Sequence, residues 1–189
     1  NINACLRSMQ QLNYPTHLVE VIVIDDFSDD ATVATVKQFS GVKVIELNAI
    51  LNEKINSYKK KAIELGVEQA TGSYIVTTDA DCVVPANWLR NFAFIIQQQP
   101  TVFVAAPVAM KEESSAIKLF QSLDFLSLQG ITAASVGAGF HSMCNGANLC
   151  YSKEAFYKVD GFKEVDHIAS GDDMLLMHKL YSEFPTQVN

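Results

Sequence analysis

The stretch Tyr74-Ile75-Val76-Thr77-Thr78-Asp79-Ala80-Asp81 decides the fold. Its β-branched run predicts a buried strand that ends in two carboxylates, one residue apart. In an extended chain alternate side chains point to the same side, so Asp79 and Asp81 would lie together at the strand end, where open α/β sheets bind ligands. Two carboxylates held this close repel each other unless a cation lies between them. A divalent Mg²⁺ or Mn²⁺ that carries a phosphate is one explanation. A solvated turn is the other, because Asp often follows strands.

Apolar runs alternate with amphipathic segments along the whole chain. Strands are expected at about 18–24, 42–47, 74–79, 102–108 and 147–151, and helices at about 2–12, 31–39, 53–70, 85–96, 114–129, 153–159 and from 172. This alternation predicts right-handed βαβ units, and therefore an α/β fold with a Rossmann-type, mostly parallel sheet flanked by helices. The small residues of 130–143 predict a mobile loop shaped by ligand. The half of the chain after residue 110 is therefore expected to be irregular.

Length and composition are typical of one globular domain. The chain has 189 residues, 49% of them hydrophobic, and no apolar run approaches the ~20 residues that cross a bilayer. The net charge of −7 argues against a nucleic-acid partner, because phosphate backbones select clustered Lys and Arg. The chain opens on a helical pattern, so the strand that normally precedes such a helix in an α/β domain is expected to be missing.

The four cysteines, Cys5, Cys82, Cys144 and Cys150, form no C-x-x-C pair and lack the density of a disulfide scaffold. We expect reduced, mostly buried thiols in a cytoplasmic protein. Cys144 and Cys150 could join His141 in a partial zinc site, although no fourth ligand is evident.

Asp25 and Asp26 follow the strand expected at 18–24, as Asp79 follows a later strand. Because the carboxyl ends of parallel strands share one edge of a sheet, these groups should border one nucleotide crevice. A carboxylate there could accept hydrogen bonds from a base N–H or a ribose hydroxyl. The alternative is an Asx turn or helix cap, which is also our interpretation of Asp29 and Asp30.

Asp172 and Asp173 follow Ser170-Gly171 at the expected start of the last helix. Near a metal, such a carboxylate could act as a general base toward a hydroxyl nucleophile. The alternative is an N-cap with two acidic residues that complement the helix dipole. In the run Lys59-Lys60-Lys61, one side chain could reach a diphosphate, whereas the usual role of such a run is a solvated helix face.

Taken together and in order, these segments resemble the inverting family 2 glycosyltransferases with the GT-A fold. The matching stretches are VIVIDDFSDDAT (21–32), KKKAIELG (59–66), GSYIVTTDADC (72–82), NGANL (145–149), GF (161–162) and GDDMLL (171–176). The resemblance covers nearly the whole chain. Its specificity comes from the order and spacing of the stretches, since no single motif is specific.

The resemblance implies a donor-binding role for the first acidic groups. Asp26 corresponds to the residue that contacts the nucleotide base, with Asp25 beside it. Asp79-Ala80-Asp81 corresponds to the DxD motif, in which the second aspartate binds the metal and the first contacts ribose or metal. The implied cofactor is Mg²⁺ or Mn²⁺.

The resemblance also implies roles for residues outside the DxD motif. Lys59 lies where the family often has a basic residue, and we include it among the residues that bind the nucleotide sugar. Asn145 and Gly146 correspond to the lining of the acceptor and donor-sugar pocket. Asp173 corresponds to the aspartate that deprotonates the acceptor hydroxyl, and Asp172 stands where the family usually has Glu.

The implied function is metal-dependent transfer of a sugar, with inversion, from a UDP- or GDP-linked donor to a hydroxyl of a glycan, lipid-linked or polysaccharide acceptor. Residues 1–189 would form one catalytic domain, with a nucleotide-binding half at 1–110 that lacks its first strand and an acceptor-side half at 111–189. We expect a cytoplasmic location, at the inner face of a membrane where segments outside this chain provide an anchor. Polysaccharide biosynthesis is the expected process.

Two other classes share part of this pattern. A phosphorelay receiver domain has an Asp-Asp pair after a strand, a later strand-end Asp and a Lys, for which Lys111 could serve. That fold takes roughly 120 residues, which would leave residues 130–189 unexplained. A nucleotidyltransferase of similar fold shares the sheet and the metal chemistry, and its Gly-rich loop would follow the strand that is expected to be missing.

Overall fold

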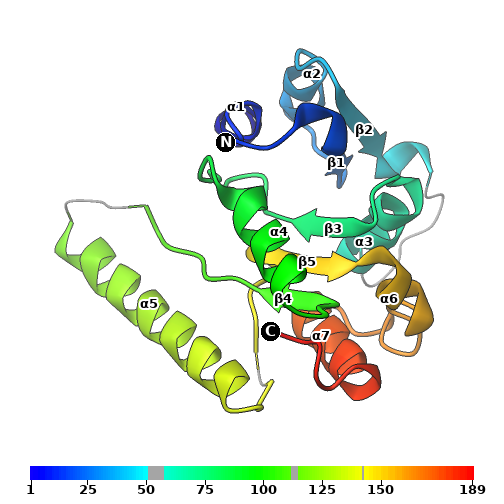
Figure 1. The fold of residues 1–189 in the computed structure, drawn as a ribbon. Helices are drawn as coiled ribbons and strands as arrows, with labels where there is room; N and C mark the ends of the chain where they lie inside the picture. The colour runs from blue at the N-terminus through cyan, green and yellow to red at the C-terminus, as the bar shows by residue number, and fades with distance from the viewer. Residues whose placement is uncertain (51–57, 112–114, 142) are drawn as a thin grey trace.

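The computed structural model describes residues 1–50, 58–111, 115–141 and 143–189. Its strands are β1 (Val21–Asp25), β2 (Val42–Glu46), β3 (Tyr74–Thr77), β4 (Phe103–Ala105) and β5 (Leu149–Ser152). Its helices are α1 (Ile2–Gln10), α2 (Thr32–Val36), α3 (Tyr58–Gln69), α4 (Trp88–Gln98), α5 (Ala116–Gly137), α6 (Lys153–Lys158) and α7 (Asp172–Glu183), and 3-10 turns form at η1 (Thr16–Leu18), η2 (Leu47–Ala49) and η3 (Gly146–Asn148) (Figure 1). The predicted α/β class is confirmed.

The expected strands form, and each is shorter than predicted. The first begins at Val21, because Thr16–Leu18 turns as a 3-10 helix. β4 ends at Ala105, two residues before Pro107, which has no N–H to donate to a ladder. The helix predicted over 53–70 is confirmed for Tyr58–Gln69, and its predicted start lies outside the described residues.

The strands form two sheets. In the first, β1 and β2 are parallel, with Val21 opposite Val42. In the second, β5 lies between β3 and β4 and is antiparallel to both, so β3 and β4 run in the same direction. β5 runs in the opposite direction because the chain leaves the sheet at the end of β4, passes along α5 and re-enters at the same end, where Leu149 pairs with Ala105 (Figure 1). The parallel pairing that was expected for most of the sheet therefore holds for β1 and β2, while the second half follows a different path.

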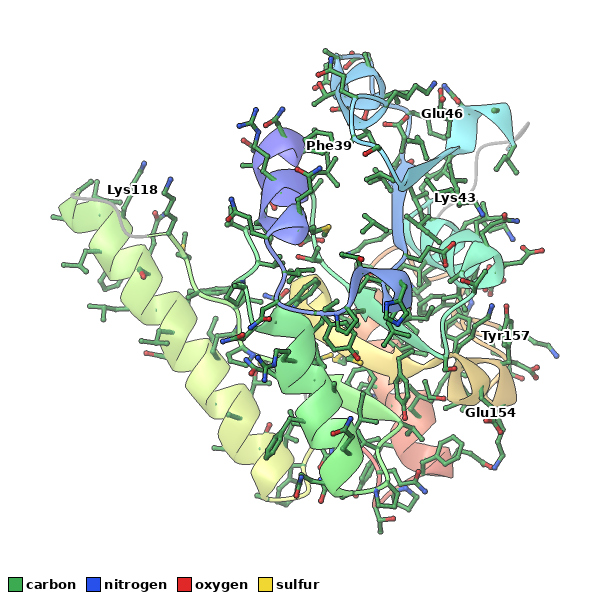
Figure 2. All side chains as sticks on the ribbon, turned by 45° about the horizontal axis from the view of Figure 1, so that its top comes forward. Phe39, Lys43, Glu46, Lys118, Glu154 and Tyr157 are labelled. Atoms are coloured by element: carbon green, nitrogen blue, oxygen red, sulfur yellow. The ribbon has the colours of Figure 1, made fainter. Side chains whose placement is uncertain are left out.

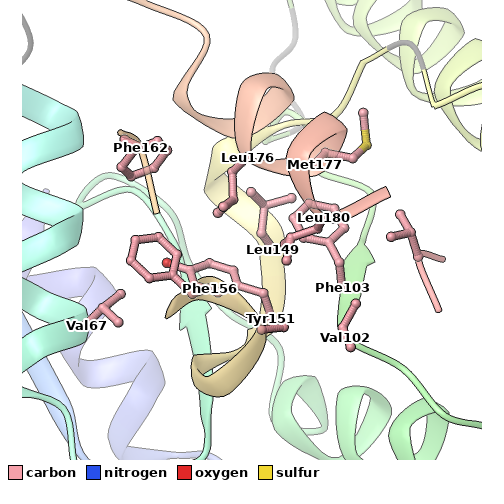
Figure 3. Packing of buried hydrophobic residues seen from close by; sticks show 12 residues of the cluster. Val67, Val102, Phe103, Leu149, Tyr151, Phe156, Phe162, Leu176, Met177 and Leu180 are labelled. Atoms are coloured by element: carbon pink, nitrogen blue, oxygen red, sulfur yellow. The ribbon is translucent and has the colours of Figure 1, made fainter. Parts of the chain in front are cut away.

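Helices cover both faces of the second sheet. On one face Leu149 and Tyr151 of β5 pack against Leu176 and Leu180 of α7 (Figure 3). On the other face Cys150 joins a cluster with Trp88 and Phe92 of α4. Alternate residues of one strand thus serve two clusters, as strand geometry requires. The first sheet has its own smaller cluster with α1 and α2, built on Ile2, Leu6 and Val36.

The prediction of a mobile loop at 130–143 is wrong for Gly130 to Gly137, which are helical. Helix α5 continues through Gly130 to Gly137, because a single Gly costs a helix only about 1 kcal/mol and the Ala and Ser residues after it are compatible with helix. The helix ends where Phe140 donates to the carbonyl of Ser135 at 2.7 Å, with Gly139 at a φ of 79°. Small residues alone therefore did not indicate a loop.

Helix α5 stands apart from the rest of the molecule (Figure 1). Its side chains, among them that of Lys118, project away from the helix axis (Figure 2). None of its described residues is buried. Large apolar side chains on it are exposed: Ile117, Leu119, Phe120, Leu123, Leu126, Leu128 and Ile131. Within the described ranges, no helix combines the length and the apolar character that crossing a bilayer requires.

Candidate active site

A cavity of about 640 Å³ lies between β1 and β3 and is bordered by α1 and α3. This volume is within the range of roughly 300–1,000 Å³ that is typical of ligand pockets. Much of its wall is apolar. The rest includes residues from the end of β3 and the turn after it, from the starts of α3 and α7, and from η3: Lys59, Thr77, Thr78, Asp79, Ala80, Gly146, Asp172 and Asp173. The structure thus brings six of the predicted site residues (Lys59, Asp79, Ala80, Gly146, Asp172 and Asp173) to one cavity.

Asp173 is fixed by two backbone N–H groups. Its Oδ2 accepts from Gly146 at 2.9 Å, and its Oδ1 accepts from Met174 at 2.8 Å. The carbonyl of Gly146 in turn accepts from Thr77 Oγ1 at 2.8 Å. The last residue of β3 is therefore connected through Gly146 to the first turn of α7. Thr77 was not among the predicted site residues, although its place just before the Asp-x-Asp pair could have indicated it.

Asp172 forms an ion pair with Lys59. The distance from Lys59 Nζ to Asp172 Oδ2 is 3.4 Å, and the side chain of Asp172 is 10% exposed while that of Lys59 is 53% exposed. Gly146 lies against this pair, because a Cβ at that position would be 3.3 Å from Lys59 Nζ and 3.6 Å from Asp172 Oδ2. A Cβ at position 146 would therefore require the exposed, flexible end of Lys59 to shift slightly. The neighbouring Asn145 caps η3, and its Oδ1 accepts from Ala147 at 3.0 Å.

The prediction that Lys59-Lys60-Lys61 forms a solvated helix face is wrong for Lys60. The residue is 2% exposed, and its Nζ donates to the carbonyls of Ile168 at 2.5 Å and Ser170 at 3.0 Å. Lys59, by contrast, is largely exposed, as predicted. Nothing in the run of three lysines distinguishes the buried one, since its position depends on the segment that packs over α3 from more than 100 residues later in the chain.

The Asp-x-Asp pair lies in a turn and not on the strand, so the argument from extended alternation is wrong. β3 ends at Thr77, and the N–H of Cys82 closes a turn on the carbonyl of Asp79 at 3.1 Å. Asp79 and Asp81 are both exposed. Burial, followed by the Cys82 thiol and the Asp81 carboxylate, raises the pKa of the Cys5 thiol, which lines the cavity.

Among the described residues, no three His, Cys, Asp or Glu side chains form a group that could hold a metal ion. The zinc set of His141, Cys144 and Cys150 is therefore not formed. The ring of His141 stacks instead on Tyr181 at 4.1 Å between centroids. Burial, together with Asp173 and Asp172, raises the pKa of the Cys144 thiol, which disfavours the thiolate that a metal needs. Two exposed aspartates still fit Mg²⁺ or Mn²⁺, since these ions use one or two carboxylates together with phosphate oxygens.

The end of β1 contains a buried carboxylate oxygen without a partner. Asp25 is 3% exposed; its Oδ2 accepts from the N–H of Ser28 at 3.3 Å, whereas its Oδ1 has no hydrogen-bond partner among the described residues. The bond to Ser28 fits the predicted turn. The unpaired Oδ1 is unusual, because buried polar atoms nearly always have a partner. Asp26 is exposed beside it and, like Asp25 and Asp81, is not part of the cavity lining.

The model of glycosyl transferase family 2 matches residues 1–160 of this chain. Among curated proteins, the poly-β-1,6-N-acetyl-D-glucosamine synthase of Staphylococcus epidermidis is 26% identical over 185 residues, which are 93% of this chain and 41% of that protein. Glycosyltransferase AglE of Haloferax volcanii is 33% identical over 91 residues, 48% of this chain and 29% of that protein. The matched residues therefore span less than half the length of either relative.

Two solved structures are similar in fold. The mannosyltransferase PcManGT from Pyrobaculum calidifontis, in complex with GDP-Man and Mn²⁺, has a TM-score of 0.67 and 19% identity, over 95% of this chain and 47% of that chain. Staphylococcus aureus TarS in complex with UDP-GlcNAc has a TM-score of 0.65 and 18% identity, over 95% of this chain and 49% of that chain. The family model matches most of the sequence, and the fold is that of GT-A glycosyltransferases. The chain therefore belongs to glycosyl transferase family 2.

Proposed function

We propose that this chain is the catalytic domain of an enzyme that transfers a sugar from a UDP- or GDP-linked donor to a hydroxyl of a glycan or lipid-linked acceptor, with inversion. The observation that carries the proposal is the gathering of Lys59, Asp79, Asp172 and Asp173 around one cavity. An aspartate of the Asp-x-Asp turn lines the same cavity as a fixed carboxylate that could serve as a base. Membership of the family favours this function over a receiver domain or a nucleotidyltransferase.

The donor would bind where β1 and β3 end. The unpaired Oδ1 of Asp25 could accept a hydrogen bond from a base N–H, which would remove the cost of burying an unsatisfied oxygen. Asp26, exposed at the next position, would contact the nucleotide from the solvent side. The side chain of Lys59 is half exposed, so it could turn from Asp172 toward a diphosphate.

Asp81 and Asp79 would hold the divalent metal together with the donor phosphates. When bound there, the metal supplies positive charge next to the oxygen of the departing nucleoside diphosphate. PcManGT was solved with Mn²⁺ and GDP-Man, which supports a divalent ion in this fold. The two aspartates would also repel a donor that arrives without the ion, since carboxylate and diphosphate are both negative.

Asp173 would act as the general base. Each of its oxygens already accepts one backbone N–H, which fixes the orientation of the carboxylate and leaves lone pairs for an acceptor hydroxyl. The proton would pass to Asp173 as the acceptor oxygen attacks the anomeric carbon from the side opposite the leaving group. Base catalysis of this kind typically contributes about 10²–10⁴-fold.

The two halves of the domain would divide these tasks. Asp25, Asp79 and Asp81 come from residues 1–110, which would bind the nucleotide, whereas Gly146 and Asp173 come from residues 111–189, which would hold the acceptor. A cytoplasmic location, at the inner face of a membrane in a longer protein, is part of the proposal. The free thiols of all four cysteines support a reducing compartment.

Thermal-shift titration tests the donor and the metal together. UDP-GlcNAc and GDP-Man are each added to the 189-residue chain with Mn²⁺ or with EDTA, and at least one of them should raise Tm only with Mn²⁺. Asp81→Ala should abolish that shift, while the control Asp29→Ala, an exposed residue of the turn after β1, should retain it. A shift that persists in EDTA and survives Asp81→Ala would contradict the proposed metal site.

A further inference from the structure

The ammonium group of Lys60 is buried, and no ion pair with a carboxylate compensates it among the described residues. Its exposed fraction is 2%, and its partners are two backbone carbonyls, those of Ile168 and Ser170. Burying a charge is costly even when it is hydrogen-bonded, and an apolar side chain at such a position usually stabilises a protein as well or better. A lysine in this place therefore points to a requirement other than stability.

The two carbonyls belong to the irregular segment that leads into α7. In this segment Glu164 has a φ of 74° and Gly171 a φ of 73°, so the chain turns sharply just before Asp172. A second lysine holds the beginning of the segment, because Lys179 Nζ donates to the carbonyls of Gly161 at 2.7 Å and Lys163 at 3.0 Å. Lys60 holds its end, directly before the two aspartates.

Two successive residues of α3 thus bind the start of α7 at two points. Lys60 binds the carbonyl of Ser170, and Lys59 pairs with the carboxylate of Asp172. Between them lies Gly171, after which α7 begins and presents Asp173 to the N–H of Gly146. Of these two contacts, that of Lys60 is buried and therefore protected from competition by water, whereas that of Lys59 is half exposed.

We propose that Lys60 is a positioning residue. Its ammonium fixes Ser170, and through it the first turn of α7, so that Asp173 stays in register with Gly146. The catalytic consequence rests on the proposed function, because it takes Asp173 as the base. The geometric consequence does not depend on any activity.

Hydrogen exchange measured by NMR tests the geometric part in the 189-residue chain. In Lys60→Met, which keeps the length of the side chain and removes its donors, the amides of Gly146 and Met174 should exchange at least 10-fold faster, while amides of β5 keep their protection. Lys61→Met is the matched control from the same helix, since Lys61 is partly exposed and pairs with Glu64, and it should change neither amide. Unchanged exchange at Gly146 and Met174 in folded Lys60→Met would overturn the proposal.

A second variant covers the case in which Lys60→Met does not fold. Lys60→Gln retains a donor that is too short to serve both carbonyls, so the two amides should lose part of their protection. Full protection in Lys60→Gln would overturn the proposal in the same way.

Kinetics in the longer enzyme test the catalytic part. Lys60→Met should lower kcat by roughly 10²-fold, as expected for a base displaced by about 1 Å, with the KM for the donor within about twofold of wild type. Lys60→Arg, which keeps donors for both carbonyls, should recover much of the loss. A lowered kcat that Lys60→Arg does not restore, or a change confined to KM, would contradict a positioning role. If the wild-type enzyme transfers no sugar, the proposed function fails, and the exchange experiment still decides whether Lys60 fixes α7.

Discussion

Asp173 Oδ2 accepts a hydrogen bond of 2.9 Å from the N–H of Gly146, a residue 27 positions earlier in the chain. This bond joins the start of α7 to the turn that precedes β5, and the carbonyl of the same Gly146 is bound by Thr77 at the end of β3. The proposed base is thereby held relative to the strand that leads to the Asp-x-Asp turn.

Replacing Asp173 separates a catalytic role from a structural one. Asp173→Asn keeps an oxygen that can accept from Gly146 but cannot take a proton, so transfer by the longer enzyme should fall about 10²–10⁴-fold while donor binding stays nearly intact. If Asp173 only complements the helix dipole, the substitution should instead cost about 0.3–1 kcal/mol of stability and leave activity largely unchanged. Asp172→Asn, which removes the partner of Lys59, should be milder, and a larger loss of transfer from Asp172→Asn would identify it as the base.

Because Oδ1 of Asp25 is unpaired among the described residues, replacing Asp25 should affect stability and nucleotide affinity in opposite directions. In Asp25→Asn the side-chain oxygen can still accept from Ser28, and the buried negative charge is gone. The free energy of unfolding of the ligand-free chain should therefore stay the same or rise, whereas the affinity for UDP or GDP should fall by at least about 10-fold, a loss of 1.4 kcal/mol. Urea unfolding and isothermal titration measure the two quantities. Lower stability with unchanged nucleotide affinity would assign Asp25 to the turn alone.

Side chains of α5 should contribute little to the stability of the domain. Phe120 and Leu123 are exposed, so the double substitution Phe120→Gln and Leu123→Gln, which retains good helix formers, should change the free energy of unfolding by no more than about 0.5 kcal/mol. Phe103→Ala is the control, because Phe103 is fully buried and its truncation should cost about 3–5 kcal/mol. A loss above about 2 kcal/mol from the α5 substitutions would mean that this helix packs against the domain in solution.

Alkaline pH should destabilise the fold through Cys150. Burial raises the pKa of its thiol to about 12, compared with about 8.5 in an unfolded chain. Because the unfolded state loses the proton first, the stabilising contribution is complete below about pH 8.5 and decreases as pH rises from there toward 12. One such group adds a slope of about 1.4 kcal/mol per pH unit to the free energy of unfolding. Cys150→Ala should reduce the slope measured by urea unfolding between pH 9 and 10, and Cys82→Ala, in the turn after β3, should leave it unchanged.

The sequence predicted the parts of the fold that depend on neighbours along the chain. The β-branched runs at 21–25 and 74–77 form strands, and the acidic residues after Gly171 begin a helix. The exception is α5, where Gly130 and the small residues after it were taken for a loop although nothing in them excludes a helix.

The candidate site was predictable in composition but not in geometry. Lys59, Asp79, Asp172 and Asp173, which the sequence analysis names as site residues, line one cavity. The burial of Lys60 could not be predicted, because its partners Ile168 and Ser170 come from the other half of the chain. The same holds for the opposed direction of β5, which depends on the path that α5 takes between β4 and β5.

Because β5 lies between β3 and β4, this strand determines how the second sheet unfolds. Both pairings between the named strands of the second sheet involve β5, and its successive residues reach two separate clusters, with Tyr151 in one and Cys150 in the other. Detaching this strand would expose both clusters at once, so the second sheet should open only in a single cooperative step. The β1–β2 pair has its own cluster with α1 and α2 and could exchange or melt by itself. The nucleotide end of the site would then lie at the boundary between a region that opens readily and one that does not.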